Sequence, residues 1–354
     1  MKKFRTIALL LGIIMILGAA AACSAPPAST EPTAAPTAAA TEAVTTEQPT
    51  PEAPKVRVAV IFGGPITDLG WNQDSYETLM KLQTEYNLDV SFQENVSAGD
   101  AKDVIRNYAS EGYNLVVSSE QYHTEAMAEA AKEFPDVTFG LVNGYMGGDN
   151  LISITGTNWQ ASYLAGVLAG YATESGKIGI LTATESPTAK RMANAYAEGA
   201  KITNPDVEMI HAFVGSFNDV VKGKELVASM IEQGVDVLYS QSGAVNAGAV
   251  EACKEAGIKA IGAIVDMSSL APDTVLASAM LPPGNILRMI VEGYLDGSMK
   301  GSPNVLVYGL KEGVEELRFN EQLKSTIPQD VLTAIDKARQ DVIDGVVVIP
   351  EVKE

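Results

Sequence analysis

The sequence has 354 residues, 46% of them hydrophobic, which is enough to bury the cores of two domains of ordinary size. Its 44 acidic and 25 basic residues give a net charge of −19, which argues against a nucleic-acid partner, because nucleic acid is bound by clustered Lys and Arg. Histidine occurs only twice and no cluster has metal-ligand spacing, so we expect neither a metal site nor a cofactor.

The first 22 residues are typical of a secretory signal peptide. A positively charged start precedes the apolar run 7-IALLLGIIMILGAAAA-22, and small alanines stand directly before Cys23. This placement resembles a bacterial lipobox, which implies that residues 1–22 are removed and that Cys23 is lipidated. A plain signal peptide with an incidental Cys is the alternative. The apolar run is shorter than the roughly 20 residues that a membrane span needs.

Residues 23–54 are predicted to form a disordered tether. After Cys23 they are almost wholly Ala, Pro, Thr, Ser and Glu, with no aromatic residue and little to bury. The prolines favour an extended spacer that lifts a globular domain away from a surface. The other cysteine, Cys253, lies in a helical pattern and has no partner once Cys23 is acylated, so no disulfide is expected.

From residue 56 onward, short apolar runs alternate with amphipathic stretches. Strands are predicted at residues 56–62, 89–95, 114–119, 137–142, 151–155, 177–183, 207–214, 236–240, 259–265, 275–280 and 304–310. Helices are predicted between most of them, including 72–86, 100–111, 123–134, 158–173, 188–203, 219–233, 245–256 and 284–298. Apolar strands separated by helices indicate parallel sheets covered on both faces, so the fold class is α/β of the doubly wound kind.

The globular part contains an internal repeat. The segment 105-IRNYASEGYNLVVSS-119 matches 227-VASMIEQGVDVLYSQ-241 in its order of helix, glycine and apolar strand. At the same offset, 131-AKEFPDVTFGLV-142 falls opposite 253-CKEAGIKAIGAI-264. Two similar doubly wound lobes in tandem are the simplest interpretation. Because parallel sheets bind ligands at the carboxyl ends of their strands, we expect the loops there to line one cleft between the lobes.

The loops expected at this cleft are rich in aromatic rings and short polar groups. A planar ligand needs both kinds, since rings stack on it and a few convergent donors and acceptors orient it. Ionised Asp accepts hydrogen bonds strongly, and Asn both donates and accepts. The candidate ligand-binding residues are Asp68, Trp71, Asn72, Gln121, Tyr122, Asn158, Phe217, Ser242, Gly243 and Asp266.

These candidates also have structural interpretations. Asp68 and Asn72 are suited to capping the helix that starts near residue 72, and Asp266 to capping the turn that follows it. The aromatic candidates fit core, turn or exposed positions: Trp71, Phe217 and Tyr122. The sequence has no GxSxG elbow, no P-loop and no GxGxxG after the first strand, so little in it favours an enzyme.

Several segments resemble the basic membrane protein family of ABC-transporter substrate-binding lipoproteins. They are 64-GPITDLGWNQDSYE-77, 94-ENVSAGDAKDVIRNYASEGYNLVV-117, 159-WQASYLAGVLAGYATESGKIGIL-181, 214-VGSFNDVVKGKELVASMIEQGVDVLY-239 and 262-GAIVDMSSLAP-272. The resemblance implies a type I periplasmic-binding-protein-like fold with crossover segments at a hinge. It places the N-lobe at residues 56–157 plus about 275–303 and the C-lobe at 158–274 plus about 304–354.

The resemblance also implies roles for individual residues. Asp68 matches an Asp of the family's first loop, and Asn72 follows the aromatic position as it does in nucleoside binders. Trp71 and Phe217 match two aromatics, one from each lobe, that could enclose a ring. Asp266 matches an Asp that is expected to hold ribose hydroxyls.

In two places the sequence departs from the family's pattern. Nucleoside binders usually carry a Lys near the position of Leu281, and the segment 118-SSEQYHTEA-126 is unlike the family's glycine-containing loop. The Leu weakens the case for ribose recognition. The aromatic pair is retained, which favours a free base or another flat heterocycle.

We therefore expect a lipid-anchored, extracytoplasmic solute-binding protein of an ABC importer, and not an enzyme. It would capture a purine nucleoside or purine base as a monomer. Its other partners would be the permease of the ABC transporter and, through the lipid anchor, the membrane. A sugar receptor of the same fold, a ligand sensor for a membrane receptor and a nucleoside hydrolase are the alternatives.

Overall fold

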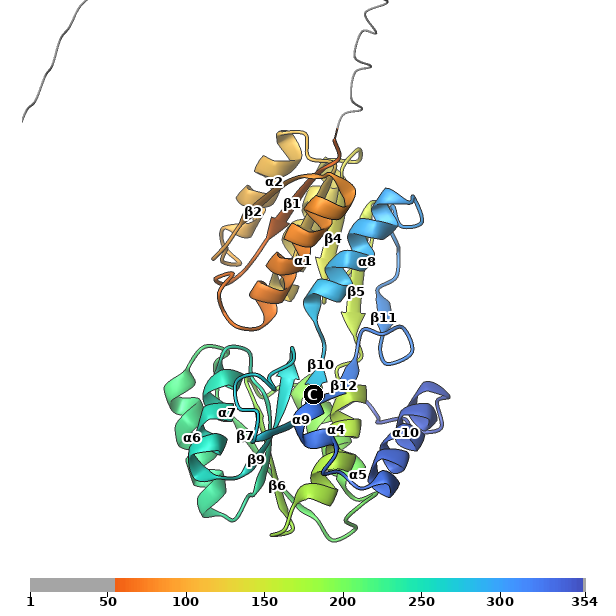
Figure 1. The fold of residues 1–354 in the computed structure, drawn as a ribbon. Coiled ribbons are helices and arrows are strands. Elements are labelled where there is room, and N and C mark those ends of the chain that lie inside the picture. The colour runs from red at the N-terminus through yellow and green to blue at the C-terminus, as the bar shows by residue number, and fades with distance from the viewer. Residues whose placement is uncertain (1–54, 353–354) are drawn as a thin grey trace, which may run out of the picture. The chain divides into compact units, whose positions relative to one another are not determined.

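The computed structural model describes residues 55–352, which form one compact unit containing two sheets and their covering helices (Figure 1). The predicted signal peptide, tether and lipidated Cys23 lie outside the described residues. Within residues 55–352, none of the helices combines the length and the apolar character that a membrane crossing requires.

The first sheet is parallel throughout, in the order β11-β5-β4-β3-β1-β2. Its strands are β1 (Arg57–Ile61), β2 (Asp89–Gln93), β3 (Leu115–Ser118), β4 (Thr138–Val142), β5 (Leu151–Gly156) and β11 (Leu306–Tyr308). Helices α1 (Trp71–Tyr86) and α8 (Pro283–Leu295) pack on one face. The other face carries α2 (Ala101–Ser110) and α3 (Thr124–Glu133), which the short helix η1 (Gln121–His123) precedes.

The second sheet has the order β12-β10-β9-β8-β6-β7, with only β12 antiparallel to its neighbour. Its strands are β6 (Lys177–Thr182), β7 (Glu208–Phe213), β8 (Val237–Gln241), β9 (Lys259–Ile264), β10 (Val275–Met280) and β12 (Glu316–Phe319). Helices α4 (Gln160–Ala172), α5 (Pro187–Ala200) and α10 (Gln329–Ile343) pack on one face, and α6 (Val220–Glu232) and α7 (Val245–Ala256) on the other. The short helix α9 (Glu321–Lys324) follows β12.

The two halves share one topology, which confirms the prediction of two similar doubly wound lobes. Strands β1–β5 and β6–β10 follow the same spatial order, and one late strand extends each sheet. Side chains alternate between the two faces along each buried strand, so both faces of the sheet are apolar and are covered by helices. In β1, Val58 and Val60 enter the core under α1 and α8, whereas Ala59 and Ile61 enter the core under α2 and α3.

The chain passes between the sheets three times, in the segments that follow β5, β10 and β11. This differs from the expected lobe boundaries, which placed residues 275–303 in the first lobe and 304–354 in the second. Strand β10 pairs with β9 and β12 of the second sheet, and β11 pairs with β5 of the first. The repeat gives the reason: each half completes five strands before the chain leaves it, so the second crossing follows β10.

The glycines of the run 164-LAGVLAG-170 allow α4 and α5 to meet backbone against backbone. A Cβ at Gly166 would lie 2.0 Å from the carbonyl oxygen of Tyr196, and a Cβ at Gly199 would lie 2.0 Å from that of Tyr163. Any larger residue at these positions would push the two helices apart. This contact fixes the start of α4, which directly follows the first crossover.

Candidate ligand-binding site

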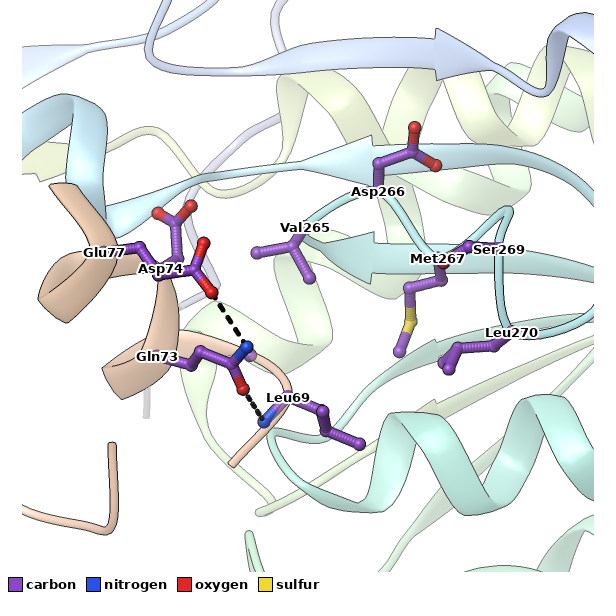
Figure 2. A pocket seen from close by; sticks show the side chains of 10 residues that line it. Leu69, Gln73, Asp74, Glu77, Val265, Asp266, Met267, Ser269 and Leu270 are labelled. Carbon is purple, nitrogen blue, oxygen red and sulfur yellow. Dashed lines mark hydrogen bonds between the residues drawn. The ribbon is translucent and has the colours of Figure 1, made fainter. Parts of the chain in front are cut away.

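A cavity of about 220 Å³ lies between the start of α1 and the loop after β9. Figure 2 shows the α1 side chains standing opposite those of the second lobe. The lining residues are Leu69, Gly70, Gln73, Asp74 and Glu77 from the first lobe and Val265, Asp266, Met267, Ser269 and Leu270 from the second. The cavity is smaller than the roughly 300–1,000 Å³ of sites for drug-sized ligands, so it suits a small molecule that touches both lobes.

The wall of this cavity is acidic. Three of its lining residues carry a carboxyl group, namely Asp74, Glu77 and Asp266, and none is Lys or Arg. Burial raises the pKa of Asp74, whose Oδ2 accepts a hydrogen bond from the backbone N–H of Gly284 at 2.8 Å. Such a wall favours neutral or cationic ligands and repels phosphorylated ones.

Asp68 organises the loop that leads into α1. Its carboxylate accepts hydrogen bonds from the backbone N–H groups of Gly70, Asn72 and Gln73 at 2.9, 3.0 and 3.1 Å. It also accepts one from the Asn72 side-chain amide at 2.9 Å. These contacts correspond to the capping interpretation, because they satisfy N–H groups in the first turn of α1. A binding role for Asp68 and Asn72 stays a prediction.

Trp71 lies where the two lobes meet. Its partly buried indole packs against apolar clusters of both lobes, and its ring N–H donates to the carbonyl oxygen of Ser119 at 2.8 Å. Phe217, on the loop after β7, is 57% exposed. Neither residue lines the cavity, and no ring contact within residues 55–352 joins them. Their enclosure of a ligand ring therefore stays a prediction.

The segment after β3 presents a carboxyl group that the sequence reading did not single out. Burial raises the pKa of Glu120 to about 7, and the negative charge of Asp68 adds to this effect. The neighbouring candidates Gln121 and Tyr122 are exposed, and burial together with Glu120 raises the pKa of Tyr122 to about 12. The segment 118-SSEQYHTEA-126 was noted as unlike the family's loop. The sequence did not indicate how exposed its side chains are or which groups they contact.

Other candidates serve the framework of the second lobe. Ser242 is buried and donates through Oγ to the Leu181 carbonyl at 3.0 Å. Gly243 has a φ of 63°, and a Cβ there would lie 3.1 Å from the carbonyl oxygen of Phe217. It therefore allows the loop after β8 to lie against the loop that carries Phe217.

Asn158 lies in the first crossover. Its φ is 65°, its backbone N–H donates to Glu315 Oε1 at 2.7 Å, and its amide donates to the Gly156 carbonyl at 2.8 Å. The backbone N–H thus connects the first crossover to the third, whereas the side-chain amide closes a local turn at the end of β5. A contact between Asn158 and a ligand stays a prediction.

Asp266 lies two residues beyond the end of β9, on the loop where the sequence predicted it. Its Oδ1 accepts a hydrogen bond from the Ser268 N–H at 2.9 Å, so it closes its own turn. Asp266 also lines a second hollow of about 480 Å³, formed with β12 and α9. Its exposed carboxylate therefore borders open space on two sides, and the first cavity is the one that reaches both lobes.

A two-lobed fold with a small cavity shared between the lobes is what a solute-binding protein requires. The Bmp family, described as PnrA-like substrate-binding proteins of ABC transporters, matches this chain over residues 55–353. The chain belongs to the Bmp family. Because the family consists of solute-binding proteins of ABC transporters, this Bmp protein is an extracytoplasmic binding protein and not an enzyme.

Relatives and solved structures agree with the Bmp assignment. The chain is 29% identical to a purine-binding protein of Brucella abortus (strain 2308), with 74% of this chain and 75% of that protein covered. It is 29% identical to the ABC transporter nucleoside-binding protein BmpA of Lactococcus lactis, with 80% and 86% covered. An ABC transporter solute-binding protein from Aeropyrum pernix K1 has the same fold, at a TM-score of 0.76 and 22% identity over 84% of this chain and 94% of that one.

Proposed function

We propose that this protein captures a purine nucleoside or purine base for an ABC importer. The observation that carries the proposal is the cavity itself, because the start of α1 and the loop after β9 line one small space from both lobes. The ligand class is supported by the purine-binding and nucleoside-binding relatives. The acidic wall favours a nucleoside or base over a nucleotide.

The proposed mechanism is capture without chemistry. The ligand binds to one lobe, the crossover segments flex, and the closed form is favoured by the extra contacts that the second lobe makes. Trp71 and Phe217 would stack on the two faces of the ring, and Asp266 would accept from ligand hydroxyls or N–H groups. The closed form would then deliver the ligand to the permease.

A ligand panel tests this function. We expect adenine, adenosine, guanosine or inosine to raise the melting temperature of the purified protein, whereas AMP, ribose, galactose and xylose should not. Calorimetric titration and mass spectrometry of any copurified small molecule identify the tightest ligand. Stabilisation by a sugar alone would favour the sugar-receptor alternative, and release of free base from adenosine would favour a hydrolase.

The lipid anchor has its own test. In bacterial cells that express the full chain, labelled palmitate should be incorporated into the protein and the protein should fractionate with membranes. Cys23→Ala should abolish both results. Cys253→Ala is the matched control, because Cys253 is fully buried in the second lobe. Undiminished labelling of Cys23→Ala would contradict lipidation at that residue.

A further inference from the structure

One oxygen of the Glu120 carboxyl group is free. Its Oε1 accepts a hydrogen bond from the Gly63 N–H at 3.2 Å and lies 3.3 Å from Ser119 Oγ. Ser119 has a single hydroxyl proton, and Ile61 O and Asn72 Oδ1 also lie within its reach at 3.3 and 3.4 Å. No group in residues 55–352 donates to Oε2. This oxygen is not among the buried atoms that lack a partner, so it keeps some exposed surface.

Aromatic residues flank this carboxyl group. A Cβ at Gly63 would lie 1.7 Å from Tyr122 Oη and 2.6 Å from Glu120 Cγ, so both side chains lie directly over this glycine. The Tyr122 side chain is half exposed. The Trp71 indole is bonded to the carbonyl of Ser119, the residue before Glu120. A flat ligand that contacts Trp71 and Tyr122 would therefore lie near the Glu120 carboxyl group.

The surroundings favour the neutral acid. Asp68, on the loop after β1, opposes a negative charge on Glu120, and burial opposes it more strongly. Tyr122 is uncharged near pH 7. The His123 ring nitrogens face Ser118 Oγ and Val96 O, and burial lowers the pKa of His123, so it supplies no cation. Asn72, the α1 residue within reach of the Ser119 hydroxyl, does not titrate.

The hydrogen-bond pattern is compatible with a neutral carboxylic acid, because one oxygen accepts and the other has no protein partner. An acid has one carbonyl oxygen, which accepts, and one hydroxyl, which must donate. In the neutral form of Glu120, Oε1 would be the accepting oxygen, and Oε2 would carry the proton and have no protein acceptor. Burying that donor beside a ligand is favourable only if the ligand supplies an acceptor.

We propose that Glu120 contacts the ligand as a neutral acid and donates its Oε2–H to an unprotonated ring nitrogen of the heterocycle. This inference rests on the proposed function and deepens it, because it names the ligand atom type that is read and links capture to pH. Binding takes up a proton where free Glu120 is ionised. The affinity is highest below about pH 7 and falls as the pH rises through that value.

Calorimetric titration with adenine between pH 5.5 and 8.5 tests the inference. For the wild-type protein we expect the dissociation constant to be constant at low pH and to rise about tenfold per pH unit once Glu120 ionises. Calorimetric titrations at pH 8 in buffers of different ionisation enthalpy should reveal that adenine binding takes up a proton. Glu120→Gln keeps a donor that cannot titrate, so it should bind within about threefold of wild type at pH 6 and show no pH dependence.

Two further experiments test the contact between Glu120 and the ring nitrogen. Glu120→Ala should bind at least about tenfold more weakly at pH 6, with its folding checked by circular dichroism. Of 1-, 3- and 7-deazaadenine, the one that lacks the contacted nitrogen should bind the wild type more weakly than adenine does. Glu120→Ala should bind this analogue and adenine equally well. Glu125→Gln, an exposed carboxylate five residues along the chain, should behave as wild type.

The outcomes separate the two proposals. A wild-type protein that binds purines with a pH-independent affinity, or a Glu120→Gln variant that keeps the pH dependence, overturns the role of Glu120 and leaves the proposed function intact. A wild-type protein that binds no purine at any pH overturns the proposed function itself.

Discussion

Asp266 has one carboxylate oxygen in its own turn and the other free toward solvent. The bond from the Ser268 N–H fixes the side chain in place at the edge of the cavity. A fixed acceptor of this kind suits a pair of ribose hydroxyls. The residue can therefore serve both its turn and a ligand.

Asp266→Asn should weaken nucleosides more than free bases. Asn keeps an acceptor for the turn but loses the charge that strengthens a bond to a hydroxyl, so we expect about a tenfold loss for adenosine and less than about threefold for adenine. Calorimetric titration of both ligands measures this difference. An equal loss for adenosine and adenine would contradict contact with ribose.

Residue types alone did not reveal which of the candidate site residues already hydrogen-bond to other groups of the protein. Asp68 was predicted both as a cap and as a ligand group, and its carboxylate is engaged by α1. Asn158 was predicted as a ligand group, but its backbone N–H bonds Glu315 of another crossover and its side-chain amide bonds the nearby Gly156 carbonyl. Glu120 was missed because its burial and its free oxygen depend on how two loops pack over Gly63, a long-range property.

Among the elements, the first and third crossovers are held together by Glu315. This buried carboxyl group accepts hydrogen bonds from Thr157 Oγ1, from Asn158 N at 2.7 Å and from Ala161 N at 2.9 Å. Burial raises its pKa, and these donors oppose that rise. All its partners are donors, so the start of α4 is bound to the segment before β12.

Glu315→Gln should destabilise the protein. The amide would direct N–H groups at backbone N–H groups, so we expect a loss of about 2–3 kcal/mol in the free energy of unfolding, measured in urea. Glu312→Gln is the control on the same segment, because Glu312 is exposed and accepts one bond, from Gly309 N at 3.0 Å. It should lose less than about 1 kcal/mol. Equal losses would show that the crossovers do not depend on Glu315.

A second junction joins α1 to α8, directly after the second crossover. Asp74 accepts from Gly284 N at 2.8 Å, and burial raises the pKa of Asp74 above its usual 3.8. A raised carboxyl pKa adds stability that is fully present below 3.8 and is lost as the pH rises through the folded-state value. Ionisation of Asp74 therefore lowers the stability of the folded protein.

Asp74→Asn keeps the acceptor without the charge. At pH 7 it should unfold no more easily than the wild type, and the decline in stability above pH 4 should become shallower. Asp74→Ala leaves the Gly284 N–H unpaired and should cost about 1–3 kcal/mol at pH 7. Urea unfolding at pH 4 and 7 checks both variants. A loss for Asp74→Asn as large as that for Asp74→Ala would contradict this account.

At the scale of the molecule, periodicity and the repeat were enough to predict the α/β class and the two lobes. Apolar, mostly buried strands such as β3 and β9 can be recognised from their own residues. The strand β12 was not predicted, because 316-ELRF-319 is short and half charged. The partners of β10 and β11 were also misplaced, since sheet-edge pairing depends on where the chain crosses.

Lobe closure should be visible through the two tryptophans of the chain. Trp71 packs against both lobes, whereas Trp159 is 5% exposed within the second lobe and carries Arg191 over its ring at 5.3 Å. Closure around a ligand changes the surroundings of the first indole and leaves those of the second unchanged. Ligand-induced fluorescence changes should therefore come from Trp71.

Two matched variants separate the indoles. Trp159→Phe should keep the fluorescence change on addition of the tightest ligand of the panel, and Trp71→Phe should lose it while calorimetry still detects binding, because Phe can also stack. Small-angle scattering of the wild type should show a smaller radius of gyration with ligand. If the signal vanishes in Trp159→Phe, or the radius stays constant while heat is released, the ligand does not draw the lobes together around Trp71.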